Sequence, residues 1–301
     1  MKKGLVITAF MIIVFISSSV LFGNTLEERL SKFAGDNGKN YMKPFITAFG
    51  TNLNTGWFQT AKVTKPFRFG FTLSTALAFV PEEDMKFMAS NPDTNLYIGN
   101  EVESATIFGN DGGYFDSKVT GIDALMLPKG IDLNIVPFVF PQVFVGLPGG
   151  FEIIGRYFPP VELSKDIGEI SFWGLGLKYQ VSKLIPLCPV AISLQGVYQQ
   201  FKLEDIITAN CTFFNAQLSK GLVVVPITLY GGIGIENTTV TAKYEYTGGI
   251  NNTNEVKFDI TVENEFRVIL GMRYKLLILD ICADYSFGKY SVARLGLGFS
   301  L

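Results

Sequence analysis

A long alternation of side-chain character constrains this chain more than any other feature of its sequence. Odd positions from Phe67 to Phe79 are apolar or aromatic except Thr75, and even positions are small or polar. Successive side chains of a strand point to opposite faces of a sheet, so this period of two predicts a strand with one apolar face. The run exceeds the roughly 5–6 residues of an ordinary strand and suits the ~9–11 residues of a tilted strand that crosses a lipid bilayer.

The same alternation recurs to the end of the sequence. Tight connections at Leu147-Pro148-Gly149-Gly150 and at Asn264 predict hairpins between neighbouring segments. The last segment keeps its aromatic residue at Phe299, two positions before Leu301. Further alternating segments lie at 190–199, 227–236, 255–263, 266–275, 277–287 and 293–301.

Composition separates this pattern from a helical membrane protein. Hydrophobic residues make 48% of the chain and the mean hydropathy is +0.30, yet after the first two dozen residues no apolar run approaches the ~20 residues of a spanning helix. We therefore predict an all-β fold, an antiparallel transmembrane β-barrel of about 12–14 strands with a short N-terminal helical segment. A soluble β-sandwich also alternates, but it fits poorly with such long strands. Aromatic residues expected to form interfacial girdles are Trp173, Tyr179, Tyr198, Tyr274, Tyr285 and Tyr290.

The N-terminal region predicts export. Lys2 and Lys3 precede an apolar stretch from Leu5 to Ile16, and small residues follow it. We expect residues 1–23 to be a cleaved signal peptide, with an uncleaved anchor helix as the alternative. Residues 24–62 are expected to form a helical plug or rim segment, with helices after Thr25 and over 41–49, and residues 63–301 the barrel. The predicted location is the cell outer membrane, with its lipid bilayer and the barrel assembly machinery as partners.

The residue types exclude several kinds of chemistry. The chain has no histidine, which removes the Ser–His and Asp–His mechanisms that barrel hydrolases use. No Cys/His cluster or phosphate-binding glycine motif is present, and a net charge of −2 gives no basic nucleic-acid footprint. We predict no enzyme activity, no cofactor, no metal and no nucleic-acid partner. Cys188, Cys211 and Cys282 cannot all pair; buried or lipid-facing thiols and a Cys188–Cys211 bridge both remain open.

Charges of both signs occupy the polar faces of the predicted strands. They fit a polar passage or ligand site, and equally a lumen filled by cross-strand ion pairs. Residues predicted to face the lumen are Arg68, Thr72, Arg156, Lys178, Arg267, Arg273, Asp280, Asp284 and Arg294. Phe71, Leu270 and Leu295 are predicted to face lipid.

Three stretches carry a family resemblance: 44–62, the segment 140–148 with 156–159, and 174–179 leading to 184–186. They resemble a family of uncharacterised secreted barrel proteins, similar in layout to FadL-type hydrophobic-substrate transporters. The resemblance implies a plug within the barrel and the passage or binding of a small hydrophobic solute. Phe45, Phe49, Trp57 and Phe58 are the expected plug or ligand contacts. The alternative is a structural or scaffold barrel with a plugged lumen, displaying an exposed loop over 81–116.

Overall fold

The computed structural model describes residues 36–164, 168–204, 207–247 and 253–301 of the 301-residue chain. The predicted signal peptide and the helix expected after Thr25 lie outside these ranges. No helix within the described part of the chain is long and apolar enough to span a membrane.

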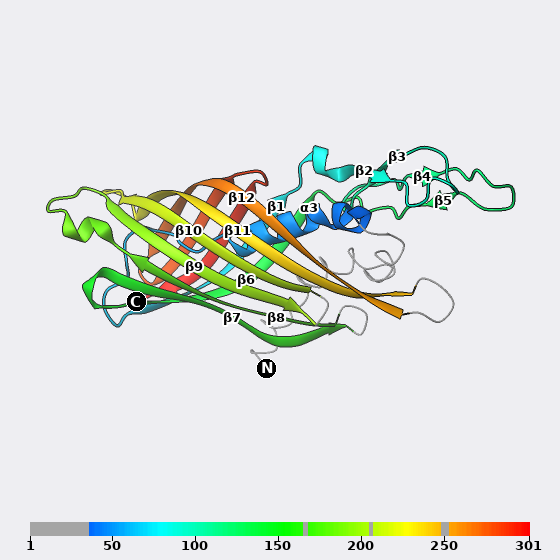
Figure 1. Cartoon of the computed structure of the whole chain (residues 1–301). Coiled ribbons are helices and arrows are strands. Elements are labelled where there is room, and N and C mark those ends of the chain that lie inside the picture. Colours follow the sequence, from blue (N-terminus) through cyan, green and yellow to red (C-terminus); the bar gives the residue numbers. More distant parts are fainter. Residues whose placement is uncertain (1–35, 165–167, 205–206, 248–252) are drawn as a thin grey trace.

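Ten strands form a closed antiparallel barrel (Figure 1), so the predicted all-β barrel is confirmed. Each strand pairs with its sequence neighbour, and β1 closes the barrel between β6 and β14. In order around the barrel the strands are β1 (Phe69–Phe79), β14 (Val292–Ser300), β13 (Leu279–Phe287), β12 (Thr253–Leu276), β11 (Ile227–Thr247), β10 (Ile207–Gly221), β9 (Ala191–Leu203), β8 (Gly168–Tyr179), β7 (Phe151–Ser164) and β6 (Ile135–Gly146).

The predicted number of 12–14 strands is wrong. Segments 255–263 and 266–275 were expected to be two strands joined by a hairpin at Asn264, but β12 runs without a break for 24 residues through that position. Its partner β11 has 21 residues, and the pairing register shifts between Gly234 and Glu236. A β-bulge of this kind interrupts the alternation without ending the strand, so the sequence pattern resembles two strands. The hairpin predicted at Leu147-Pro148-Gly149-Gly150 is confirmed between β6 and β7.

The two ends of the barrel differ. We call the end where β1 begins the turn end; its connections are 147–150, 180–190, 222–226 and 277–278. At the opposite loop end, residues 80–134 form an insertion that projects beyond the barrel (Figure 1).

The insertion is more than the exposed loop expected over 81–116. It holds a 3₁₀ turn η1 (Glu82–Met85) and two small sheets, one of β2 (Lys86–Ser90) with β3 (Glu101–Ala105) and one of β4 (Tyr114–Phe115) with β5 (Leu125–Met126). Phe108 and Phe115 are buried in its core. Apolar residues between the acidic ones therefore give the insertion a packed interior.

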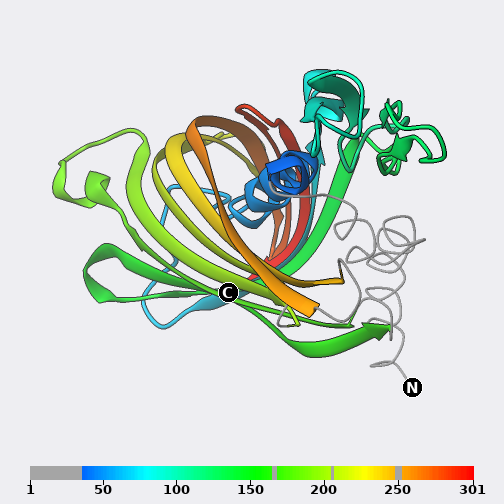
Figure 2. The same ribbon diagram turned by 45° about the vertical axis from the view of Figure 1, so that its right-hand side comes forward.

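The helix α3 (Asp36–Leu53) lies at the loop-end mouth with its C-terminal part inside the barrel (Figure 2). It includes the expected stretch 41–49 but starts five residues earlier, so Pro44 lies in its interior rather than in its first turn. Asn37 ties it to the insertion, because its amide donates to the Ser90 carbonyl oxygen at 2.7 Å and accepts from the Ser90 N–H at 2.8 Å.

The outer face of the barrel is apolar on every strand. One exposed apolar residue from each of the ten strands is Phe69, Val143, Ile153, Trp173, Leu194, Phe214, Ile233, Leu270, Tyr285 and Leu297. Of the aromatic residues expected on this face, Tyr290 is instead buried in the β13–β14 connection. All three cysteines are free thiols, so the possible Cys188–Cys211 bridge is absent.

Candidate functional site

The lumen of the barrel is occupied by residues 51–64, which we call the plug. The chain leaves α3 at Leu53, crosses the lumen and reaches the turn end before β1. Side chains of the barrel wall bind the plug chiefly through its backbone, and buried arginine and lysine residues provide most of these contacts.

Arg156 of β7 is the central wall contact. Its Nη1 donates to the carbonyl oxygen of Leu53 at 2.9 Å and its Nη2 to that of Thr55 at 2.6 Å. The guanidinium lies 3.9 Å from the centre of the Trp57 ring and 3.8 Å from that of Phe140. No carboxylate among the described residues forms an ion pair with Arg156. Its buried charge is therefore stabilised by carbonyl dipoles and aromatic faces, several of which belong to the plug.

Arg267 of β12 combines an ion pair with plug contacts. Its Nη2 lies 2.8 Å from Glu236 Oε1 and donates to the Thr51 carbonyl oxygen at 2.9 Å. Its Nη1 donates to the Thr55 hydroxyl at 2.8 Å. The pair is almost fully buried, and the single carboxylate does not satisfy all the N–H donors of Arg267. The plug supplies acceptors for the remaining donors.

Arg294 of β14 repeats this arrangement on the neighbouring wall. It forms an ion pair with Asp284 at 2.5 Å. Its Nη2 also donates to the Tyr230 hydroxyl at 3.0 Å and to the Phe58 carbonyl oxygen at 3.3 Å. Its Nη1 donates to the Gly56 carbonyl oxygen at 3.3 Å. Asp284 and Arg294 lie opposite each other in adjacent strands, so the pair is formed within the wall and extended to the plug.

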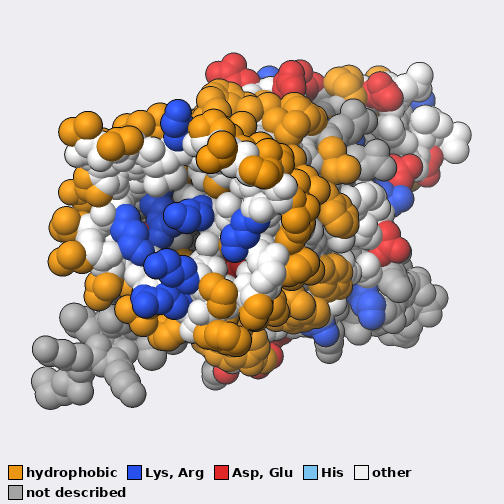
Figure 3. Space-filling view, turned by 90° about the vertical axis from the view of Figure 1, so that its left-hand side faces the viewer, with side chains coloured by type: hydrophobic (Ala, Val, Ile, Leu, Met, Phe, Trp, Pro, Cys, Tyr) orange, Lys and Arg blue, Asp and Glu red, His pale blue; other side chains and the backbone are white. Residues whose placement is uncertain are grey.

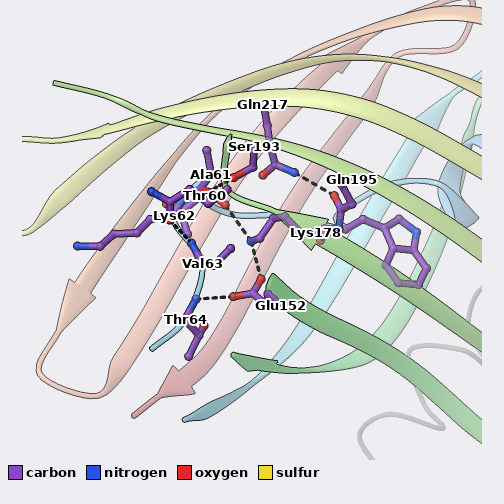
Figure 4. A network of polar contacts seen from close by, with 12 residues as sticks. Thr60, Ala61, Lys62, Val63, Thr64, Glu152, Lys178, Ser193, Gln195 and Gln217 are labelled. Carbon is purple, nitrogen blue, oxygen red and sulfur yellow. Dashed lines mark hydrogen bonds and ion pairs between the residues drawn. The ribbon is translucent and has the colours of Figure 1, made fainter. Parts of the chain in front are cut away.

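A fourth cation holds the end of the plug near the turn end (Figure 4). Lys178 of β8 pairs with Glu152 of β7 at 2.5 Å and donates to the Thr60 carbonyl oxygen at 3.2 Å. Glu152 accepts from the Thr64 N–H at 2.7 Å, and the Ser193 hydroxyl donates to the Ala61 carbonyl oxygen. Wall side chains thus bind both N–H donors and carbonyl acceptors of the plug backbone here.

The two aromatic plug residues pack where the wall lacks side chains. A Cβ added at Gly174 would lie 2.9 Å from the Trp57 ring, and one at Gly232 would lie 2.7 Å from the Phe58 ring. Glycine therefore permits the close approach of these rings. A remaining cavity between Trp57, Gln59 and the wall has a volume of about 20 Å³, which accommodates no more than one water molecule.

Phe45 and Phe49 lie elsewhere, at the loop-end mouth. They stack with ring centroids 5.8 Å apart, and Phe49 contacts Phe138 at 5.6 Å and Phe201 at 4.6 Å. Phe158 and Phe172 extend this group with centroids 5.4 Å apart. We call these six residues the phenylalanine mouth. Four of them are only half-buried: Phe45, Phe49, Phe138 and Phe158.

The other residues predicted to face the lumen are divided. Thr72, Asp280 and Asp284 are buried, and Arg273 is half-buried and pairs with Asp280 at 2.6 Å. Arg68 is exposed at the turn end, before β1 begins. Of the residues predicted to face lipid, Leu270 and Leu295 are exposed on the outer face, and Phe71 is half-buried beside Phe299 there. Within the described ranges, no group of three or more Cys, Asp or Glu side chains could hold a metal ion.

Several plug contacts were missed from the sequence. The Gln195 amide donates to the Trp57 carbonyl oxygen at 3.1 Å, and Gln142 and Gln199 accept from Arg156 at 3.0 and 3.3 Å. Their strand positions place them on the polar face, which is a usable signal. However, an uncharged amide gives no indication of its partner, so apart from Thr72 only charged residues of that face were selected.

A family model described as "Family of unknown function (DUF6588)" matches residues 1–301. The chain belongs to this family. No curated protein matches this DUF6588 sequence. Solved barrels overlap with it weakly. The N-terminal β-barrel domain of Pseudomonas aeruginosa OprF is 18% identical, with a TM-score of 0.27 over 50% of this chain and 94% of that one.

Two further solved structures give similar values. The translocator domain of the autotransporter NalP from Neisseria meningitidis is 8% identical, with a TM-score of 0.31 over 87% of this chain and 96% of that one. The P. putida toluene transporter TodX is 12% identical, with a TM-score of 0.25 over 79% and 68%. At TM-scores this low, the likenesses carry no inference about what the DUF6588 chain binds. The expected likeness to FadL-type transporters is not shown.

Proposed function

We propose that this chain is an outer-membrane barrel whose lumen is closed by its own plug. Exposed apolar side chains on all ten strands support a lipid-facing wall, because soluble monomers rarely expose a continuous apolar surface of this extent. Barrels of this class have short periplasmic turns and longer extracellular loops. The turn end therefore faces the periplasm, and the insertion faces outside.

Thiol labelling of intact cells tests this orientation. Cys188 is half-buried in a turn-end connection, while Thr120 is exposed in the insertion. A Thr120→Cys variant should react with a large polyethylene-glycol maleimide added outside cells, and Cys188 should react only after the outer membrane is opened. Reaction of Cys188 in intact cells would reverse the orientation.

The observation that carries closure is the binding of plug carbonyl oxygens by Arg156, Arg267, Arg294 and Lys178. Charge-assisted hydrogen bonds in a buried site are stronger than neutral ones. Together with the buried rings of Trp57 and Phe58, each contributing roughly 1.5–3 kcal/mol, they support a plug held firmly at rest. Passage of a solute then requires the plug to move.

Conductance in planar bilayers tests closure. We expect the mature full-length protein to conduct little, and a variant that lacks residues 24–62 to conduct strongly while still migrating as a folded barrel. Removal of the plug takes away the carbonyl oxygens that Arg156 binds, and Arg156 has no carboxylate partner among the described residues. The open lumen should therefore prefer anions. A folded deletion variant with unchanged conductance would contradict the plug, as would steady conductance of the parent protein.

The phenylalanine mouth favours binding of a small hydrophobic solute as a second function of the same barrel. Four half-buried rings offer apolar surface at the loop end. Exposure of this surface to water costs free energy, which a bound apolar solute would recover by covering it. The probe is 1-N-phenylnaphthylamine, whose fluorescence increases in apolar sites. Phe158→Ser should weaken its binding to the protein in nanodiscs, whereas Tyr157→Ser, on the adjacent outward-facing position, should leave it unchanged. Equal binding by both variants would remove this function.

A further inference from the structure

The turn-end mouth of the barrel is a hollow lined by basic side chains. Figure 3 views this end and shows lysine and arginine side chains gathered in the hollow, with apolar side chains around it. Lys62 is exposed near the end of the plug, and Lys65 and Arg68 are exposed on the segment that leads from the plug to β1. Arg273 and Lys275 are half-buried at the end of β12. Plug and wall therefore both contribute cations to one opening.

The backbone that carries these cations is fixed. The Phe67 N–H donates to the Gly146 carbonyl oxygen at 2.8 Å, and the Gly146 N–H donates to that of Arg68 at 2.9 Å. On either side of Lys62, the Ala61 N–H donates to the Ser219 hydroxyl at 3.0 Å and the Val63 N–H to Gln180 at 3.1 Å. Lys62 points away from the Glu152–Lys178 pair (Figure 4). The backbone at Lys62 and at Arg68 is thus fixed by hydrogen bonds to the wall, and no carboxylate among the described residues pairs with either side chain.

Negative charge is scarce at this end. The nearest wall carboxylates, Glu152 and Asp280, are buried and already paired with Lys178 and Arg273. Segments 54–68, 147–150, 180–190, 222–226 and 277–278 contain no Asp or Glu. Among the described residues, Lys62, Lys65 and Arg68 form no ion pair. By contrast, the insertion at the other end contains ten acidic and three basic residues.

Grouping like charges this way is unfavourable without a counter-ion. Lys275 lies opposite Asp280 of β13, whose carboxylate attracts it but is already paired with Arg273. Arg273 and Arg68 repel it, and its ammonium group donates to the Ser300 hydroxyl at 2.5 Å. Repulsion between neighbouring cations opposes folding. A bound anion would offset that repulsion, and a concave site lined by one sign of charge concentrates such ligands.

We propose that the turn-end hollow binds a polyvalent oxyanion, with phosphate or clustered carboxylate groups, through Lys62, Lys65, Arg68 and Lys275. The proposal rests on the closed barrel described above, because the plug and wall cations meet only while the plug is in place. Bound there, the anion links the plug to β12 and stabilises the closed state. Release of the anion at the periplasmic mouth and movement of the plug are therefore coupled.

Calorimetric titration of the full-length protein with pyrophosphate, in an uncharged detergent, tests the site. We expect saturable binding that weakens with added salt. The double variant Lys65→Gln/Arg68→Gln should weaken it about tenfold or more, because two charge-assisted contacts are lost. Lys220→Gln is the matched control, since Lys220 is exposed at the same end but on the outer face of β10. Parent-like binding by the double variant, or no binding by the parent, would overturn the proposal.

An anionic lipid headgroup offers the same chemistry as a free anion, and nanodiscs distinguish the two sources. If phosphatidylglycerol nanodiscs weaken pyrophosphate binding relative to phosphatidylcholine nanodiscs, the headgroup occupies the site; equal binding identifies a soluble anion. The proposal that the plug closes the barrel has its own test, which is whether the parent protein conducts in planar bilayers. A conducting parent that still binds pyrophosphate retains the site and loses only its coupling to closure.

Discussion

Arg156 donates from Nη2 to the carbonyl oxygen of Thr55 at 2.6 Å, across 101 positions of sequence. The contact joins a wall strand to the plug, and a second bond to the Leu53 carbonyl oxygen reinforces it at 2.9 Å. Two buried acceptors on the plug thus depend on one side chain of the wall.

Replacing this arginine should release the plug. Arg156→Met leaves the two carbonyl oxygens without their donor, and an unsatisfied buried polar group costs about 1–3 kcal/mol. We expect brief openings in planar bilayers and faster trypsin cleavage after Lys62. Lys202→Met removes a lysine that is exposed on β9, two strands away from β7 in the barrel, and it should behave like the parent. Identical plug protection in both variants would show that Arg156 does not hold the plug.

How much of this arrangement the sequence predicts depends on the kind of contact. Alternation over 67–79 predicts the strand that the structure has as β1, and parity assigns Arg267 and Arg294 to the same side as the buried residues. The partners of these arginines in the plug were not predictable, because all but the Thr55 hydroxyl are backbone carbonyl oxygens, which every residue type carries. The strand count was also not predictable, because the irregular pairing of β11 with β12 resembles a turn.

Close packing between Gly232 and Phe58 gives a second prediction. A methyl group at position 232 would lie 2.7 Å from the tip of the Phe58 ring, so Gly232→Ala should destabilise plug docking by roughly 1–3 kcal/mol through overpacking. Phe58→Leu in the same chain should restore protection of the plug from trypsin. Gly221→Ala is the control, because its nearest neighbour would be the Thr228 hydroxyl at 3.8 Å. No rescue by the double variant would mean that the ring is not the clashing group.

The outer wall offers a test of its lipid contact. Leu270 in β12 has 57% of its surface exposed, and an arginine there should cost ~2–4 kcal/mol if the position lies near the bilayer midplane. Met88 in the insertion is 52% exposed, and Met88→Arg should be neutral because water surrounds it. The measurement is the fraction of heat-modifiable folded barrel in lipid vesicles across a urea series. Equal folding of the two variants would place Leu270 outside the lipid.

Tyr290 gives a pH dependence to the contact between barrel and insertion. It lies in the β13–β14 connection at the loop end, and its hydroxyl donates to Asp84 Oδ2 at 2.7 Å. Burial raises the pKa of Tyr290 above its ordinary value of 10.0, and the hydrogen bond and negative charge of Asp84 raise it further. Both effects favour the neutral phenol, which is the form that donates.

The direction of the pH effect follows from this raised pKa. Below pH 10.0 the phenol is neutral in both docked and released states, so its full contribution is present. Above that value the released phenol ionises while the docked one does not, and the stability of the contact falls as pH rises. Limited proteolysis of the insertion should therefore accelerate above about pH 10. Tyr290→Phe should be cleaved faster at neutral pH, since a hydrogen bond to a carboxylate contributes roughly 1.5–3 kcal/mol. Its cleavage rate should also show a smaller increase above pH 10.0 than that of the parent. An equal increase in both proteins would assign the effect to other groups.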